Sequence, residues 1–351
     1  MDAILYLLIG AYTAGLSEGV YLYKFDAANG DARYVHMAAV ENPSYIDTGD
    51  GEHIYAVTEN ADAPSYANTL LFDREHERLT LVNRQETFAS SPCYIVTDKD
   101  RKYAVTANYG GGSISVFPIN QDTLMPSCQL IILEGSGADT TRQQAPHLHC
   151  VKFSPDGKYL FATDLGTDNI YRFDTDYAAG GEGGAFLKEE TMKSFRLPAG
   201  SGPRHMTFHP SDKYMYVINE LSGAVECFLY NDGDLTSFQT IQADTAGGRA
   251  SADIGITPNG KFLYASNRNK NDGIAIFSIN EADGTLVKAG YQLTGKHPRN
   301  FVITPNGKYL LAASMDSSLI EVFEIDEVTG MLRNAGKDIT DVDTPVFLKF
   351  L

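Results

Sequence analysis

The chain has 351 residues, of which 43% are hydrophobic and 21% charged, and this balance excludes a disordered or fibrous protein. Its 45 acidic and 28 basic residues give a net charge of −17, which repels phosphate backbones and anionic membrane surfaces, so we expect no nucleic-acid and no membrane partner. The first apolar run, 4–9, is too short to span a bilayer and follows no basic segment, so we expect a soluble cytoplasmic protein without a signal peptide.

Two short apolar stretches, 5–9 and 20–25, open the chain, and their pattern is typical of neighbouring β-strands. From residue 43 onward a unit repeats, and repeats of this period indicate propellers, solenoids or arrays. The first strand of each unit is marked by a proline or, once, a serine, and these markers lie 47 to 57 residues apart: Pro43, Pro92, Pro146, Pro203, Ser251, Pro298 and Pro345.

Each unit contains two further markers. A Pro-x-Gly-Lys turn leads into the second strand at 155–158, 258–261 and 305–308, because proline presets φ and glycine accepts the left-handed conformation, and weaker copies lie near residues 50, 100 and 211. The third strand carries a phenylalanine in one slot, and a polar hairpin leads from it to a fourth strand. The seven phenylalanines are Phe25, Phe72, Phe117, Phe173, Phe228, Phe277 and Phe323.

Seven four-stranded units without a helical period predict a β-propeller. The end of the chain, 344–350, supplies one first strand, and the two stretches at the start supply the second and third strands of the same unit. A blade shared by both ends closes the ring, whereas a solenoid, the alternative architecture, leaves sheet edges that must be capped. We therefore predict an all-β, seven-bladed propeller that forms a single domain over residues 1–351.

Antiparallel strands bring the start of the first strand and the end of the second strand to one face of a blade, opposite the Pro-x-Gly turns. The slot that ends the second strand always holds a small polar residue, which favours loop capping over ligand binding: Thr58, Asn108, Asp164, Asn219, Asn267 and Ser314. The next slot varies between blades and holds Glu59, Tyr109, Leu165, Glu220, Arg268 and Met315. Its charged members are candidates for ligand binding.

Basic and imidazole side chains follow the marker prolines of three units. They are His147, His149, Arg204, His205 and Arg299. Arg268 lies in the blade between the blades of His205 and Arg299. In a chain of net charge −17, this cluster indicates a small anionic ligand, and the alternative is a set of solvated charges that balance nearby acids. Two loops, 134–145 and 243–250, are expected to border the same face.

His147 and His149 lie two residues apart on one strand and should point the same way. A histidine in a β core is more often structural than catalytic, and we find no third ligand at a metal-binding spacing, so we expect neither a metal nor a cofactor. The four cysteines show no Cys-x-x-Cys spacing either and fit free thiols. The run Gly110–Gly112 is followed by no lysine or helix, which favours a hairpin over a phosphate-binding loop.

Several of these segments resemble the seven-bladed propeller lactonase family, and the resemblance covers essentially the whole chain. The matching sequences are Pro-His-Leu-His at 146–149, Gly-Pro-Arg-His at 202–205, Asn-Glu-Leu at 219–221 and Ser-Asn-Arg at 266–268. The family's named activity is 6-phosphogluconolactonase, and fungal carboxymuconate lactonizing enzymes are relatives. The resemblance implies an intracellular, metal-free hydrolase of carbohydrate metabolism, in the pentose phosphate pathway, that acts on a small anionic sugar lactone.

In the cycloisomerase relatives the active site contains a histidine, a glutamate and two arginines, and the matching positions are His149 or His147, Glu220, Arg204 and Arg268. Lactone opening needs a base for water, stabilisation of the oxyanion and a proton for the ring oxygen. We therefore predict that the histidine is the base, that Glu220 orients groups or transfers a proton, and that the two arginines stabilise charge. His205 or Arg299 would bind a phosphate, and the remaining candidate substrate-binding residues are Glu59, Tyr109, Asn219 and Asn267.

Two other functions remain possible at this stage. A carboxymuconate-type lactonizing enzyme would use the same residues on an unsaturated dicarboxylate, and a propeller can also be a binding scaffold without catalysis. The scaffold gives no reason for histidine, arginine and glutamate to gather at one face. The sequence does not decide between phosphorylated and unphosphorylated lactones, and it says nothing about the oligomeric state.

Overall fold

The computed structural model of the chain describes residues 4–178 and 185–351. Strands dominate this part of the chain, and a single 3-10 turn, η1 (Met315–Ser317), joins two of them. Among the described residues, no helix has both the length and the apolar character needed to cross a membrane. The all-β prediction is confirmed.

The strands form seven antiparallel sheets, which are the seven blades of the propeller, and each is numbered here by its first strand along the chain. Blade 1 contains β4 (Ile46–Asp47), β5 (His53–Thr58), β6 (Tyr66–Asp73) and β7 (Arg78–Glu86). Blade 2 contains β8 (Pro92–Thr97), β9 (Tyr103–Asn108), β10 (Ser113–Asn120) and β12 (Gln129–Ile132), and β11 (Thr123–Leu124) also pairs with β10. Blade 3 contains β13 (Leu148–Phe153), β14 (Tyr159–Asp164), β15 (Asn169–Thr175) and β16 (Leu187–Arg196).

The later blades repeat the same order. Blade 4 contains β17 (Pro203–Phe208), β18 (Tyr214–Asn219), β19 (Ala224–Asn231) and β20 (Asp234–Gln242). Blade 5 contains β21 (Ile254–Ile256), β22 (Phe262–Asn267), β23 (Gly273–Ile279) and β24 (Leu286–Leu293). Blade 6 contains β25 (Pro298–Ile303), β26 (Tyr309–Ser314), β27 (Leu319–Ile325) and β28 (Leu332–Asn334).

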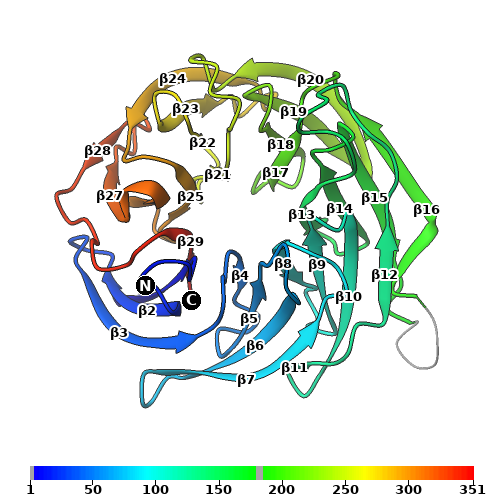
Figure 1. Cartoon of the computed structure of the whole chain (residues 1–351). Coiled ribbons are helices and arrows are strands. Elements are labelled where there is room, and N and C mark those ends of the chain that lie inside the picture. Colours follow the sequence, from blue (N-terminus) through cyan, green and yellow to red (C-terminus); the bar gives the residue numbers. More distant parts are fainter. Residues whose placement is uncertain (1–3, 179–184) are drawn as a thin grey trace. The chain divides into compact units, whose positions relative to one another are not determined.

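Blade 7 joins the two ends of the chain. Its order is β29 (Pro345–Phe350), β1 (Ile4–Ala11), β2 (Gly19–Asp26) and β3 (Ala32–Ala39), and β29, red in Figure 1, lies beside the blue N-terminal strands. In this pairing Leu7 lies opposite Phe350 and Ile9 opposite Leu348. The predicted closure of the ring by a shared blade is therefore confirmed.

The sequence markers fall where the repeat predicts. Four marker prolines are the first residues of β8, β17, β25 and β29, where a missing N–H costs least. All seven marker phenylalanines lie in the third strand of their blade, and none is more than 5% exposed. The turn glycines Gly157, Gly260 and Gly307 have φ values of 75°, 73° and 71°, so they adopt the left-handed conformation that the turn requires.

The chain groups into two compact units. The first unit contains Met1–Ala39, His205–Asn231 and Leu235–Leu351, and the second contains Val40–Arg204 and Asp232–Asp234. Blades 5, 6 and 7 and most of blade 4 belong to the first unit, and blades 1, 2 and 3 belong to the second. That residues 1–351 act as a single domain stays a prediction.

The core of each unit lies between successive blades. In β22, Leu263 and Ala265 pack with blade 4, and the alternate residues Phe262 and Tyr264 pack with blade 6. This alternation arises because successive side chains of a strand point to opposite faces. Similar clusters join blade 6 to blade 7 in the first unit and blade 1 to blade 2 in the second. The strands are thus held rigidly enough to present the residues at their ends in fixed positions.

Candidate functional site

In the first unit, Glu220 and Arg268 form a buried ion pair. Each directly follows the last residue of a second strand, β18 for Glu220 and β22 for Arg268. Arg268 Nη2 lies 3.1 Å from Glu220 Oε2, and the two side chains are 6% and 7% exposed. Arg268 Nε also donates a 2.6 Å hydrogen bond to the carbonyl of Ala250. The structure therefore brings two of the predicted site residues together.

His297 is a third member of this cluster, and the sequence analysis did not predict it. Arg268 Nη1 lies 3.0 Å from His297 Nε2, which must accept because a guanidinium can only donate. The ring proton is then on Nδ1, which lies 3.4 Å from Asp316 Oδ2. His297 has a φ of 62° just before Pro298, and its amide donates a 2.6 Å hydrogen bond to Asp272 Oδ2, which helps to hold this uncommon conformation. Hydrogen bonds at Nε and Nη1 and the ion pair at Nη2 thus fix the Arg268 guanidinium.

His205 lies in the same unit and contacts Asp253. Its Nδ1 is 2.8 Å from Asp253 Oδ1, and the side chains are 8% and 11% exposed. Burial by itself raises the pKa of the Asp253 carboxyl. The hydrogen bond and the charge of His205 lower the pKa and outweigh the effect of burial, so it lies below its ordinary value. His205 or Arg299 was predicted to bind a phosphate, and the structure places His205 against a buried carboxylate.

Tyr109 brings the two predicted histidines together in the second unit. Its ring stacks on the ring of His147 at 4.4 Å between centroids and meets His149 edge-on at 5.6 Å. His147 Nδ1 lies 3.0 Å from the carbonyl of Tyr109, so Nδ1 carries the proton and Nε2 the lone pair when the ring is neutral. His149 Nδ1 lies 3.7 Å from Cys93 Sγ.

The strand register shows which histidine corresponds to the arginines of other blades. The pairing of the first and second strands slips between Leu148 and Cys150 in blade 3, and the slip encloses His149. The same slip encloses Cys93 in blade 2 and Arg299 in blade 6. Such bulges re-aim a side chain. His149, rather than His147, therefore occupies the position that carries Arg299 in blade 6.

The other predicted residues have separate surroundings. Arg204, in the second unit, is 1% exposed, and its carbonyl accepts a 2.6 Å hydrogen bond from Thr163. In the first unit, the guanidinium of Arg299 lies 5.4 Å from the ring centroid of Tyr12. Glu59 is half-buried in the second unit, and its amide donates a 3.1 Å hydrogen bond to the carbonyl of Asn42.

The small polar residues that end the second strands hold loops, as their repetition suggested. Asn267 accepts a 2.6 Å hydrogen bond from Ser251 and donates one of 3.3 Å to the carbonyl of Ala243. Asp164 accepts hydrogen bonds from the amides of His147 and Gly166 at 2.7 and 2.9 Å. Asn219 differs, because its buried Oδ1 accepts no hydrogen bond from any described residue. Asn219 is therefore the member of this slot with capacity left for a ligand.

Buried carboxylates organise the loops that were expected to border the site. Asp244 accepts hydrogen bonds from the backbone amides of residues 246, 247, 248 and 249, at 2.6 to 3.2 Å. Asp168, which has a φ of 58°, accepts from Gly200, Gly202 and the side chain of Gln143 at 2.7 to 2.8 Å. Each loop is thus fixed to its own unit by one charge.

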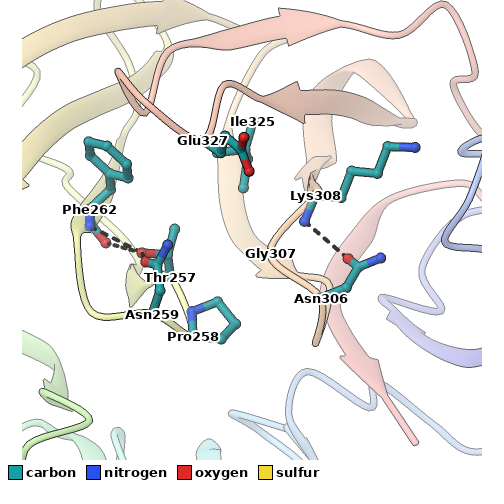
Figure 2. A pocket seen from close by; sticks show the side chains of 9 residues that line it. All are labelled: Thr257, Pro258, Asn259, Phe262, Asn306, Gly307, Lys308, Ile325 and Glu327. Atoms are coloured by element: carbon teal, nitrogen blue, oxygen red, sulfur yellow. Dashed lines mark hydrogen bonds between the residues drawn. The ribbon is translucent and has the colours of Figure 1, made fainter. Parts of the chain in front are cut away.

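Two other features of the described surface carry no site. Figure 2 shows a groove between the turns of blades 5 and 6, where Asn306 Oδ1 accepts a 3.0 Å hydrogen bond from the amide of Lys308. Asn259 Oδ1 accepts one of the same length from the amide of Lys261. Asp50, His53 and Asp122 are spaced closely enough to hold a metal ion. The guanidinium of Arg101, however, already lies 2.5 Å from Asp50 and 3.1 Å from Asp122.

Comparison with known proteins gives consistent results over the whole chain. The protein family that matches residues 6–350 is described as "Lactonase, 7-bladed beta-propeller". A 6-phosphogluconolactonase of Bacillus subtilis is 32% identical over 350 residues, which cover 98% of this chain and 97% of that protein.

Solved structures agree with this match. A candidate 6-phosphogluconolactonase from Bacteroides fragilis is 48% identical, with a TM-score of 0.97 and coverage of 100% of this chain and 98% of that one. The periplasmic gluconolactonase PpgL of Pseudomonas aeruginosa is 30% identical, with a TM-score of 0.91 and coverage of 99% of both chains.

Proposed function

Because the chain belongs to the lactonase family of seven-bladed β-propellers, we propose that it hydrolyses a sugar-acid lactone, and specifically 6-phosphogluconolactone to 6-phosphogluconate. The similarity to the Bacillus subtilis 6-phosphogluconolactonase supports this substrate. The similarity to the Pseudomonas aeruginosa gluconolactonase supports the same reaction on a sugar lactone.

The observation that carries the proposal is the buried and fully oriented guanidinium of Arg268. When water attacks the lactone carbonyl, negative charge develops on the carbonyl oxygen, and a cation that is already oriented stabilises this charge without further reorganisation. Glu220 and His297 hold the guanidinium in place. In this proposal Arg268 stabilises the oxyanion. The other roles stay predictions from the sequence: Arg204 as a second cation, and His149, or alternatively His147, as the base.

The test is a pH-stat assay of δ-6-phosphogluconolactone and of unphosphorylated gluconolactone, with the spontaneous rate subtracted. We expect hydrolysis of both lactones and a higher kcat/KM for the phosphorylated one. Turnover of carboxymuconate without turnover of either sugar lactone would assign the lactonizing reaction instead. Tight binding of the lactone without turnover would make the protein a binding scaffold.

We also propose that the protein works in the cytoplasm, because its four cysteines are free thiols, which fit a reducing compartment. The Pseudomonas aeruginosa relative is periplasmic, so the two locations must be separated by experiment. Fractionation of the native host followed by immunodetection gives the answer. Recovery of the protein in a periplasmic fraction would overturn this part of the proposal.

A further inference from the structure

Asp253 is a buried carboxylate whose hydrogen-bonding capacity is filled. Oδ1 accepts from His205 Nδ1 at 2.8 Å and from the amide of Ile254 at 2.9 Å. Oδ2 accepts from Asn300 Nδ2 at 2.5 Å and from the amide of Phe301 at 3.2 Å. A carboxylate offers about four acceptor positions, and all of them are used here. Asp253 is therefore held ionised and immobile, facing one nitrogen of His205.

This arrangement fixes the chemistry of His205. Since an ionised carboxylate can only accept, the proton on Nδ1 stays directed at Asp253, and Nε2 is the atom that gains or loses a proton. A carboxylate in hydrogen-bond contact also stabilises the protonated imidazole. The His205–Asp253 pair thus favours a protonated Nε2, and Nε2 is the ring nitrogen that can donate its proton.

Equivalent positions in other blades show that the fold does not need this charge. His205, Asp253 and Asn300 are each two residues after a marker residue, and Tyr45 and Tyr94 occupy the same offset in blades 1 and 2. There the two tyrosine rings stack, with centroids 3.7 Å apart, and join one blade to the next without any charge. Buried ion pairs often contribute less to stability than apolar contacts of similar size. A purely structural role therefore does not explain the His205–Asp253 pair.

We propose that His205 is the general acid of lactone opening and that Asp253 and Asn300 are its positioning residues, a proposal that rests on the lactone hydrolysis argued above. The oxygen of water bonds to the carbonyl carbon, and the water's proton passes to the base. The bond between the carbonyl carbon and the ring oxygen then breaks, and the ring oxygen keeps the electron pair. It takes the proton from His205 Nε2, which leaves a neutral ring with its proton on Nδ1.

Charged residues adjoin this pair along the chain segments that carry it. Asp253, from the segment before β21, contacts the ring directly. Arg204 precedes His205 on β17, and Arg299 precedes Asn300 on β25. Asn300 is neutral and is itself anchored, because its Oδ1 accepts a 2.7 Å hydrogen bond from the amide of Leu348 in β29.

The first test replaces His205 by glutamine, and His209→Gln is the matched control. His209 also lies in the first unit, but its ring contacts Ser211 and Gly260 at the turns. For His205→Gln we expect kcat on δ-6-phosphogluconolactone to fall about 100-fold, and we expect the decline of the rate at alkaline pH to disappear with the acid. For His209→Gln we expect the wild-type rate and pH profile. Wild-type kcat in His205→Gln would overturn the proposal.

The second test is Asp253→Asn. Both carboxylate oxygens of Asp253 accept hydrogen bonds, so the asparagine side chain must direct its NH2 group at some of these donors. The neutral asparagine also cannot balance the charge of a protonated His205. We therefore expect the alkaline limb of the pH–rate profile to move to lower pH. If the role of Asp253 were structural, Asp253→Asn would lower the rate equally at every pH. An unmoved limb with a reduced rate would overturn the proposal.

A third measurement does not depend on activity. NMR of the 15N-labelled imidazoles in the wild-type protein, with His205→Gln to identify the His205 signals, reports which ring nitrogen carries the proton. We expect His205 Nδ1 to stay protonated through the titration, and a neutral form protonated at Nε2 would overturn the proposal. If the wild-type protein hydrolyses no lactone, the proposed function fails. If it hydrolyses lactones and His205→Gln does so equally well, only the present inference fails.

Discussion

Two clusters that follow the second strands of their blades differ in the forces that hold them. In the first unit, Glu220, Arg268 and His297 are joined by an ion pair and by hydrogen bonds to a cation. In the second unit, Tyr109 and His147 are joined by ring stacking and by a hydrogen bond to a backbone carbonyl. The same strand-end slot, Arg268 in one blade and Tyr109 in another, thus presents a fixed charge in one place and a neutral aromatic face in the other.

The difference predicts how each cluster responds to substitution. A buried charge that loses its partner keeps the full cost of its desolvation, so an ionic cluster fails when one member is removed. Stacked rings lose only the contact itself, and the neighbours can close part of the gap. We therefore expect large effects in the first unit and small effects in the second.

The largest effect is expected for Arg268→Ala. Glu220 then remains buried without its cation, and we expect the free energy of unfolding to fall by about 3–5 kcal/mol. Loss of the oriented guanidinium should also lower kcat at least ~100-fold. Urea unfolding followed by circular dichroism and the pH-stat assay measure the two effects. A stability loss below about 1 kcal/mol would show that Glu220 is not buried as an ion.

A double variant, Glu220→Leu with Arg268→Met, separates stability from catalysis in the same cluster. Apolar side chains of similar volume remove both charges together, so we expect most of the lost stability to return. The lactonase rate should stay as low as in Arg268→Ala, because no cation is left to stabilise the oxyanion. Recovery of the rate along with the stability would contradict the role proposed for Arg268.

A smaller effect is expected for His297→Asn. Asparagine tolerates the positive φ of this position better than most residues, so the backbone should remain in place. The ring nitrogen that accepts from Arg268 is lost, and one hydrogen bond to a charged group is worth about 1.5–3 kcal/mol. We expect kcat to fall about 10- to 100-fold while KM changes little. An increase in KM at constant kcat would instead assign His297 to substrate binding.

The fold could be predicted from the sequence because each blade repeats the same local chemistry. A proline starts the first strand, a glycine with positive φ makes the turn, and a buried phenylalanine fills the third strand, as at Pro298, Gly307 and Phe323. Each of these residues belongs to a local pattern that recurs in the sequence of every blade or most blades. A single sequence is sufficient to recognise them.

The candidate site was predicted less completely, because its contacts join different blades. The ion pair of Glu220 and Arg268 spans 48 positions, and the hydrogen bonds of Asp253 reach as far as His205 and Asn300. No local pattern marks such pairs. His297 was missed because it precedes Pro298, whereas the predicted residues follow the marker prolines or lie at the ends of the second strands. The equivalence of His149 and Arg299 depends on a slip in strand register, which a count of residues from the proline does not show.

In the second unit, Tyr109→Leu is expected to have a modest effect. The backbone carbonyl that orients His147 Nδ1 remains, and the ring contacts with His147 and His149 are lost. We expect the free energy of unfolding to fall by about 0.5–1.5 kcal/mol beyond the loss of buried area. A double-mutant cycle of Tyr109→Leu and His147→Ala measures this coupling directly. A coupling of the size expected for Arg268 and Glu220 would remove the contrast between the two clusters.

The smallest effect is expected for an ionic cluster that is exposed rather than buried. Partial burial raises the pKa of the Asp50 carboxyl, but hydrogen bonds from the His53 and Glu52 amides and from the His53 ring lower it to about 2. Because the folded-state pKa lies below the ordinary value of 3.8, Asp50 contributes stability above pH 3.8 and loses it as the pH falls through about 2. Arg101, 38% exposed, is paired with Asp50, so we expect Asp50→Asn to cost less than about 1 kcal/mol at pH 6. The urea midpoint of Asp50→Asn should differ from that of wild type more at pH 6 than at pH 2. An equal difference at both pH values would assign the effect of Asp50 to its shape rather than to its charge.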